Sequence, residues 1–174
     1  MNTISDSFAG MADYAPGRSP LNLSKRILLV EDDNVIRELS AKVLLRSGYH
    51  VGTAENGQTG WEALHGDSYD LLITDNVMPK LSGLELVKKV RSARWTLPVI
   101  IASGTLDTEE LNRHQSLQIA ATLLKPFTTD QLLETVKEVL RAENSAQRRI
   151  GVRFPMPAET FARVEPFQRW GLNE

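Results

Sequence analysis

Side chains suited to phosphoryl chemistry stand at the ends of four short apolar runs in the sequence. Glu31 and Asp32 follow the first run, Asp75 ends another, Ser103 ends the next and Lys125 follows the last. A carboxylate can accept a phosphoryl group as an acyl phosphate, and a lysine and a hydroxyl can neutralise or hydrogen-bond the oxygens of that group. These residue types predict a phosphate-accepting site, provided that the fold brings them together.

The three carboxylates also predict a metal ion. Acidic groups crowded together raise one another's pKa and destabilise the fold unless a cation joins them. Oxygen ligands without imidazole or thiolate favour Mg²⁺ or Mn²⁺, and Mg²⁺ usually keeps several waters beside one or two carboxylates. We therefore expect a divalent ion beside Glu31, Asp32 and Asp75.

Five short segments are predicted to be strands, most of them apolar runs, and segments between them have helical spacing. A continuous apolar run suits a strand that is covered on both faces. The predicted strands are RILLV, HVGTA, DLLITD, VIIAS and ATLLK. The predicted helices carry Ile36 to Leu44, Trp61 and Leu64, Leu84 to Val90, Asp107 to about Ser116, and Leu132 to Leu140 with Thr128 or Thr129 as the cap.

Strands that alternate with helices predict an α/β fold, a doubly wound parallel sheet with helices on both faces. Parallel strands end at one edge of such a sheet, so the polar side chains after the first, third, fourth and fifth strands should converge there. Each feature alone has an ordinary explanation. The acidic trio from Glu31 to Asp33 could favour a helix N-terminus, and Ser103 and Lys125 could lie in ordinary turns. Their coincidence at matching strand ends favours the phosphoryl site.

The composition fits one globular domain with tails. The 174 residues, 41% hydrophobic and 24% charged, are enough for one core and too few for two ordinary domains. We expect a flexible N-terminal leader over residues 1–24, the domain over 25–142, and a C-terminal tail without its own fold over 143–174.

Composition also excludes several function classes. The absence of cysteine excludes disulfides, thiol catalysis and cysteine-ligated metal centres. A net charge of −2 means that the chain has no excess of basic residues for direct nucleic-acid binding. The N-terminus has no apolar signal region, and no stretch approaches the roughly 18 apolar residues of a membrane span. We therefore expect a soluble cytoplasmic protein without membrane contact.

Four motifs in order carry a resemblance to a known family. ILLVEDD, DNVMPKLSG, PVIIASG and LLKPF resemble the receiver domain of two-component response regulators, from about Lys25 to Arg141. The resemblance implies a stand-alone protein similar to a chemotaxis receiver. It also implies a flavodoxin-like, five-stranded parallel sheet in the order 2-1-3-4-5.

The resemblance implies a role for each acidic residue at the sheet edge. Asp75 would take phosphate from a histidine kinase. Asp32, Asp75 and the backbone carbonyl of Val77 would hold Mg²⁺, and Glu31 would assist through a water. A receiver of this kind assists its own phosphorylation and dephosphorylation and is otherwise not an enzyme.

Ser103 and Lys125 would bind the phosphate oxygens, and the bond between Lys125 and Pro126 would be the cis peptide of the family. The sequence departs from the family pattern at two places. Thr122 stands where the family usually has Tyr or Phe, and LQIAA replaces the usual glycine-containing turn before the fifth strand. The ring rotation that reports phosphorylation in the family cannot occur at Thr122.

Nothing after Arg141 is long enough for an effector domain, so we expect the output to be protein–protein contact. One hypothesis is a regulator that binds a target protein when phosphorylated. The alternatives are a phosphorelay carrier that passes phosphate to a histidine phosphotransfer protein, and a module that binds partners without phosphorylation. The sequence argues against a phosphatase of the haloacid dehalogenase kind, because its second acid would stand at Val77.

The tail offers a further hypothesis about partners. It contains four aromatic residues that could anchor a partner or a second subunit in a homodimer, or could pack back onto the domain: Phe154, Phe161, Phe167 and Trp170.

Overall fold

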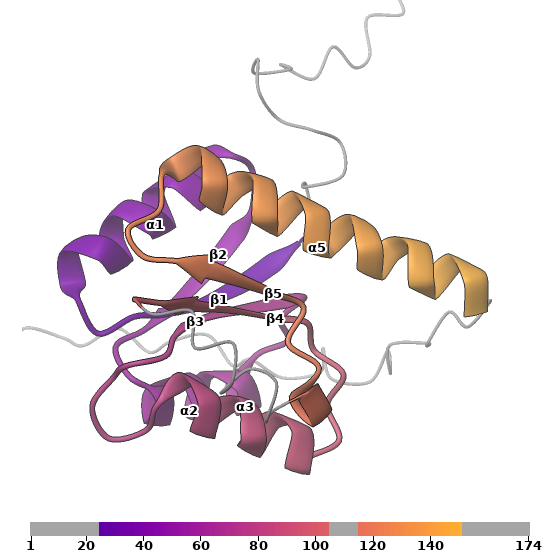
Figure 1. Ribbon diagram of the computed structural model, residues 1–174, viewed down its shortest axis with the longest axis horizontal. Helices are drawn as coiled ribbons and strands as arrows, with labels where there is room; N and C mark the ends of the chain where they lie inside the picture. The colour runs from indigo at the N-terminus through magenta and orange to yellow at the C-terminus, as the bar shows by residue number, and fades with distance from the viewer. Residues whose placement is uncertain (1–24, 105–114, 151–174) are drawn as a thin grey trace, which may run out of the picture.

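Five parallel strands form the sheet in a computed structural model, which describes residues 25–104 and 115–150 (Figure 1). The strands are β1 (Arg26–Val30), β2 (His50–Ala54), β3 (Leu71–Asp75), β4 (Val99–Ser103) and β5 (Ala121–Leu124). They pair in the order β2-β1-β3-β4-β5. The predicted doubly wound α/β fold and its strand order are confirmed.

Two pairs of helices cover the sheet. The helices are α1 (Asn34–Arg46), α2 (Gly57–Gly66), α3 (Gly83–Ser92) and α5 (Thr129–Ile150), with a short 3₁₀ helix η1 (Gln115–Leu117). Helices α1 and α5 lie on one face, and α2 and α3 lie on the other (Figure 1). No helix within 25–104 or 115–150 has the length and apolar character to cross a membrane.

Two predictions from the sequence, one helix and one domain boundary, can be compared with these elements. The helix predicted from Asp107 to about Ser116 falls almost entirely outside the described residues, and only its end overlaps η1. Helix α5 continues to Ile150, past the domain boundary expected at residue 142. The division of the chain into leader, domain and tail stays a prediction.

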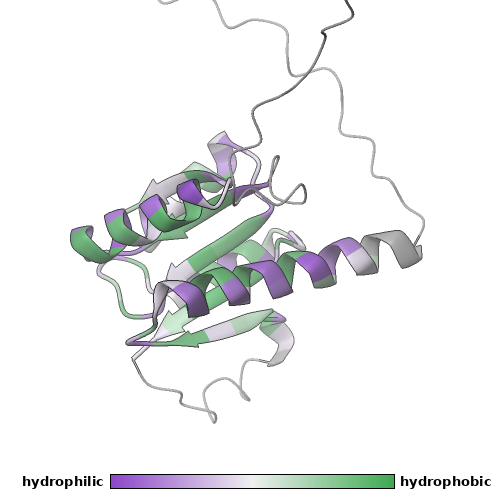
Figure 2. Cartoon of the chain, turned by 90° about the horizontal axis from the view of Figure 1, so that it is seen from above, coloured by the Kyte–Doolittle hydropathy of each residue, from purple (hydrophilic) through white to green (hydrophobic). Residues whose placement is uncertain are grey.

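The sheet separates two apolar cores. In β1, Ile27 and Leu29 pack with the core beneath α1 and α5, whereas Leu28 and Val30 pack with the core beneath α2 and α3. All four side chains are at most 4% exposed. A strand buried on both faces needs apolar residues at every buried position, which explains the continuous apolar run from Ile27 to Val30. Figure 2 shows the hydrophobic colour along the strands and alternating colours along α5.

Capping side chains determine where the helices begin at the carboxyl edge of the sheet. Asp33, Asn56 and Ser82 accept hydrogen bonds from backbone amides in the first turns of α1, α2 and α3. Thr128, one of the two predicted caps, accepts from the amide of Gln131 at 3.2 Å. Each such cap stabilises its helix by roughly 1 kcal/mol. The caps therefore hold the short loops that carry the polar residues.

Gly83 lets the first turn of α3 approach the end of β3. Its amide donates to the carbonyl oxygen of Asn76 at 3.1 Å. A Cβ atom at this position would collide with the carbonyl oxygen of Asp75. Only glycine fits there without moving the backbone that carries Asp75.

Arg91 ties the end of α3 to the segments that precede β4 and β5. Its guanidinium donates to the carbonyl oxygens of Trp95 at 2.8 Å and Leu97 at 2.9 Å. It also donates to those of Leu117 at 2.7 Å and Gln118 at 3.2 Å. Gln118 has a φ of 48°, a conformation that residues other than glycine rarely adopt. Arg91 thus stabilises the turn in which the sequence lacks a glycine.

We predict that Gly83→Ala lowers the free energy of unfolding by about 2 to 4 kcal/mol, because the methyl group displaces backbone at the end of β3. Urea denaturation measures the change. Gly66→Ala is the matched control, since a Cβ at Gly66 meets nothing within 4 Å. The control should shift stability by less than about 0.5 kcal/mol, and equal losses in both variants would contradict the prediction.

We predict that Arg91→Met lowers the free energy of unfolding by about 1 to 3 kcal/mol, because partly buried carbonyl groups lose their donor. The control is Lys88→Met, which removes an exposed charge from the same helix. Thermal and urea denaturation of both variants provide the comparison. A loss at Arg91 no larger than the loss at Lys88 would show that the four hydrogen bonds contribute little.

Candidate functional site

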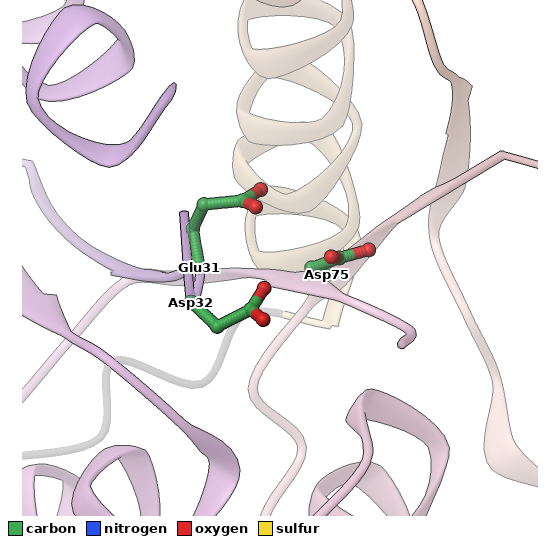
Figure 3. Close-up of side chains that lie close together, drawn as sticks. All are labelled: Glu31, Asp32 and Asp75. Carbon is green, nitrogen blue, oxygen red and sulfur yellow. The ribbon is translucent and has the colours of Figure 1, made fainter. Parts of the chain in front are cut away.

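Three carboxylates from two neighbouring strands meet at the carboxyl edge of the sheet (Figure 3). Glu31 and Asp32 follow β1, and Asp75 ends β3. The pairing of Val30 with Thr74 places Glu31 and Asp75 at the next position of the register. Oxygens of the three carboxylates lie within 4.8 Å of one another. The structure therefore brings together the acidic residues that the sequence singled out.

Lys125 joins two of these carboxylates through its ammonium group. Its Nζ atom lies 3.0 and 2.8 Å from the two carboxylate oxygens of Glu31 and 3.0 Å from Oδ2 of Asp75. The side chains of Glu31 and Asp75 are 5% and 9% exposed. Burial excludes water from these ion pairs, so the Coulomb attraction within them is stronger than in surface pairs, while desolvation of the charges offsets part of that gain.

The charges and burial of the site change two pKa values. Burial raises the pKa of the Glu31 carboxyl. The hydrogen bond and charge of Lys125 oppose this rise, whereas the charges of Asp75 and Asp32 add to it. Burial alone would lower the pKa of Lys125, but its hydrogen bonds and charge interactions with Glu31 and Asp75 outweigh burial and raise it. Lys125 is therefore a permanent cation at neutral pH.

The acidic trio after β1 divides between two roles. Asp33 caps α1 by accepting from the amides of Val35 and Ile36 at 2.8 and 3.0 Å. The ordinary explanation of the trio, a helix N-terminus, thus holds for Asp33. Glu31 is buried and turned toward Lys125, and Asp32 is exposed beside Asp75. These two residues remain candidates for the metal and phosphate site.

Ser103 ends β4, and Lys125 directly follows the adjacent strand β5. The amide of Lys125 donates to the carbonyl oxygen of Ser103 at 2.8 Å, and Ser103 pairs with Leu124 in the register. The half-buried Ser103 therefore lies at the same edge as the ammonium group of Lys125. The peptide bond between Lys125 and Pro126 is cis, as the resemblance implied.

Val77 and Thr122 are the two other residues that the family resemblance singled out. Val77 is 75% exposed, and its amide nitrogen lies 3.4 Å from Oδ1 of Asp75. The loop after β3 thus folds back over the carboxylate, while the role of the Val77 carbonyl as a metal ligand stays a prediction. Thr122 is half-buried on β5 and pairs with Ile101.

Arg37 is a residue of the site that the sequence analysis missed. Its guanidinium donates to the carbonyl oxygens of Glu31 at 2.6 Å and Asp32 at 3.2 Å, and to the side chain of Asn34 at 2.8 Å. These bonds fix the backbone of the acidic loop from the first turn of α1. The signal was weak, because an arginine on the exposed part of a helix is usually solvated.

The donor set fits a divalent cation. Three carboxylates bring three negative charges, and Lys125 neutralises one of them. Asp32 is exposed and can reach an ion from the solvent side. Hard oxygen donors of this kind suit Mg²⁺ or Mn²⁺.

Comparison with known proteins places this geometry in a family. The model of the response regulator receiver domain matches residues 27–137. The response regulator receiver protein CpdR of Brucella abortus is 34% identical over 118 residues, which cover 68% of this chain and 98% of CpdR. The transcriptional regulatory protein CusR of Escherichia coli is 33% identical over 120 residues, but these cover only 51% of CusR. The chain thus spans about half the length of several transcriptional regulators that it matches.

Solved structures show the same fold. The chemotaxis response regulator CheY4 of Vibrio cholerae has a TM-score of 0.62 at 29% identity, over 67% of this chain and 98% of CheY4. The response regulator TrrA of Thermotoga maritima, solved in complex with Mg²⁺ and BeF, has a TM-score of 0.60 at 34% identity, over 66% of this chain and 98% of TrrA. With a family match over more than half of its length and a stand-alone receiver aligned almost end to end, the chain belongs to the response regulator receiver domains.

Proposed function

We propose that this chain is a phosphoacceptor of a two-component system, in which Asp75 receives a phosphoryl group from a histidine kinase. The observation that carries the proposal is the contact between Lys125 Nζ and Oδ2 of Asp75 at 3.0 Å, in a cluster of three carboxylates. A fixed cation beside a buried carboxylate at the open edge of the sheet suits an acyl phosphate.

The proposed transfer joins an oxygen of Asp75 to the phosphorus atom of a phosphohistidine. The phosphorus–nitrogen bond breaks as the oxygen–phosphorus bond forms, and the imidazole leaves with a proton. Such a transfer depends mainly on in-line positioning and on neutralisation of the phosphoryl oxygens. Lys125 supplies a positive charge and Ser103 a hydroxyl donor at this edge. The chain acts as the acceptor and not as an enzyme on other substrates.

We assign the metal site to Asp32, Asp75 and the backbone carbonyl of Val77, with Glu31 contributing through a water. A Mg²⁺ ion bound there would neutralise charge on the phosphoryl oxygens. The contact of Glu31 with Lys125 supports an indirect role, because both carboxylate oxygens of Glu31 already accept hydrogen bonds. TrrA, which has the same fold, was solved in complex with Mg²⁺ and BeF, and this supports Mg²⁺ as the ion.

Phosphorylation would change the contacts of Lys125 first. A phosphoryl group carries about −1.5 to −2 charges at neutral pH, so it competes with Glu31 for the ammonium. The ends of β4 and β5, which carry Ser103 and Lys125, would then shift toward Asp75. Thr122 has no ring to rotate. We therefore propose a partial shift of a pre-existing equilibrium and not a complete switch.

The receiver family implies contact with kinases or phosphotransfer proteins, and two outputs are consistent with the site. A stand-alone regulator would bind a target protein after phosphorylation. A phosphorelay carrier would instead pass the phosphoryl group from Asp75 to a histidine phosphotransfer protein. Transfer to a partner histidine, followed with labelled phosphate, separates the two.

We predict that acetyl phosphate with Mg²⁺ adds one phosphate to the chain and that Asp75→Ala abolishes the addition, because it removes the attacking oxygen. Intact-protein mass spectrometry measures the label. The control Asp67→Ala removes a half-exposed carboxylate that pairs with Arg26 before β3. It should be labelled like the wild type. Undiminished labelling of Asp75→Ala would refute the assignment of the acceptor.

We predict that Asp32→Asn raises the Mg²⁺ concentration needed for half-maximal labelling by at least about tenfold, because the ion loses a charged ligand. EDTA should abolish labelling of the wild type. Asp33→Asn is the matched control, since asparagine caps a helix as well as aspartate does and Asp33 caps α1. Similar Mg²⁺ requirements in both variants would argue against a metal at Asp32.

A further inference from the structure

An apolar groove lies beside the phosphate site, between α1 and the beginning of α5. Ile36 and Leu39 of α1 form one wall, and Pro126, Phe127 and Leu132 form the other. The groove has a volume of about 440 Å³. Leu39 is 57% exposed and Ile36 is 36% exposed. A continuous apolar surface of this kind usually marks a place where another segment binds.

The groove is directly connected to the chemistry of the site. Lys125, whose ammonium group contacts Glu31 and Asp75, also lines the groove. Pro126 and Phe127 follow Lys125 in the chain, so one wall of the groove belongs to the loop that carries the ammonium group.

The length of α5 determines which part of the C-terminal segment can reach the groove. The 22 residues of α5 begin at Thr129, which lines the groove, and end at Ile150. A helix of this length spans about 32 Å. An extended chain needs about ten residues to return over that distance. Of residues 151–174, only those from about residue 160 onward can therefore reach the groove.

Aromatic residues suited to an apolar groove occur in this part of the segment. Phe161, Phe167 and Trp170 lie beyond the required length, whereas Phe154 lies only four residues after the end of α5. Aromatic side chains dominate binding in apolar pockets because they bury a large area at a small entropic cost. We infer that the segment from Phe161 to Trp170 of the same chain occupies the groove.

The docking does not depend on phosphorylation of Asp75. Its test can therefore fail while Asp75 is still labelled, and the reverse also holds.

Disulfide trapping tests the docking directly, because the chain has no cysteine of its own. The full-length variant with Leu39→Cys and Phe167→Cys is oxidised mildly at low concentration, and disulfide formation is followed by mass spectrometry. One control pairs Phe167→Cys with Leu45→Cys, which is 50% exposed on α1 outside the groove. The other control pairs Leu39→Cys with Phe154→Cys.

We expect the groove pair to form an intramolecular disulfide at least tenfold faster than either control. Equal rates for Leu39→Cys and Leu45→Cys would overturn the proposal, because the segment would then be tethered but not docked. Disulfides that link two chains would also overturn it, since a second copy would then occupy the groove.

Amide NMR shifts provide a measurement that leaves the groove intact. The triple variant Phe161→Ser, Phe167→Ser and Trp170→Ser should shift the resonances of Leu39 and Leu132, and Phe154→Ser should not. Unchanged groove resonances in the triple variant would contradict the docking, whichever result the disulfides give.

Discussion

The ion pairs of the Lys125 ammonium group with Glu31 and Asp75 are the interaction on which the site depends. They join the end of β1 to the ends of β3 and β5, which come from distant parts of the sequence. Two buried carboxylates so close together would repel each other strongly without this cation. The same ammonium is the group best placed to follow a new negative charge on Asp75. Under the proposed function, this contact is also the one that phosphorylation of Asp75 would change first.

Much of this arrangement follows from the pattern of the sequence. The apolar runs such as RILLV predict buried strands, and the alternation with helices predicts a parallel sheet, so the convergence of Asp75 and Lys125 at one edge is a consequence of topology. The different roles of Glu31, Asp32 and Asp33 could not be predicted. Whether Asp33 caps the helix and Glu31 turns toward Lys125 depends on local backbone angles that residue types do not determine.

The contacts that support the site could not be predicted from the sequence either. Arg37 binds two carbonyl oxygens of the acidic loop, and Gly83 leaves room for the backbone of Asp75. Both contacts depend on distances in space between chain segments, and the spacing of residues in the sequence does not give these distances. The missing ring at Thr122 was visible in the sequence, but the apolar groove beside Lys125 was not.

A crystal structure of the chain with Mg²⁺ and beryllium fluoride would test the central claim most directly. We expect the fluoride complex on an oxygen of Asp75, Mg²⁺ against Asp32, and the Nζ atom of Lys125 moved from Glu31 to the bound fluorides. A complex that forms elsewhere, or a Lys125 that keeps both contacts with Glu31 while Asp75 carries the fluorides, would contradict it.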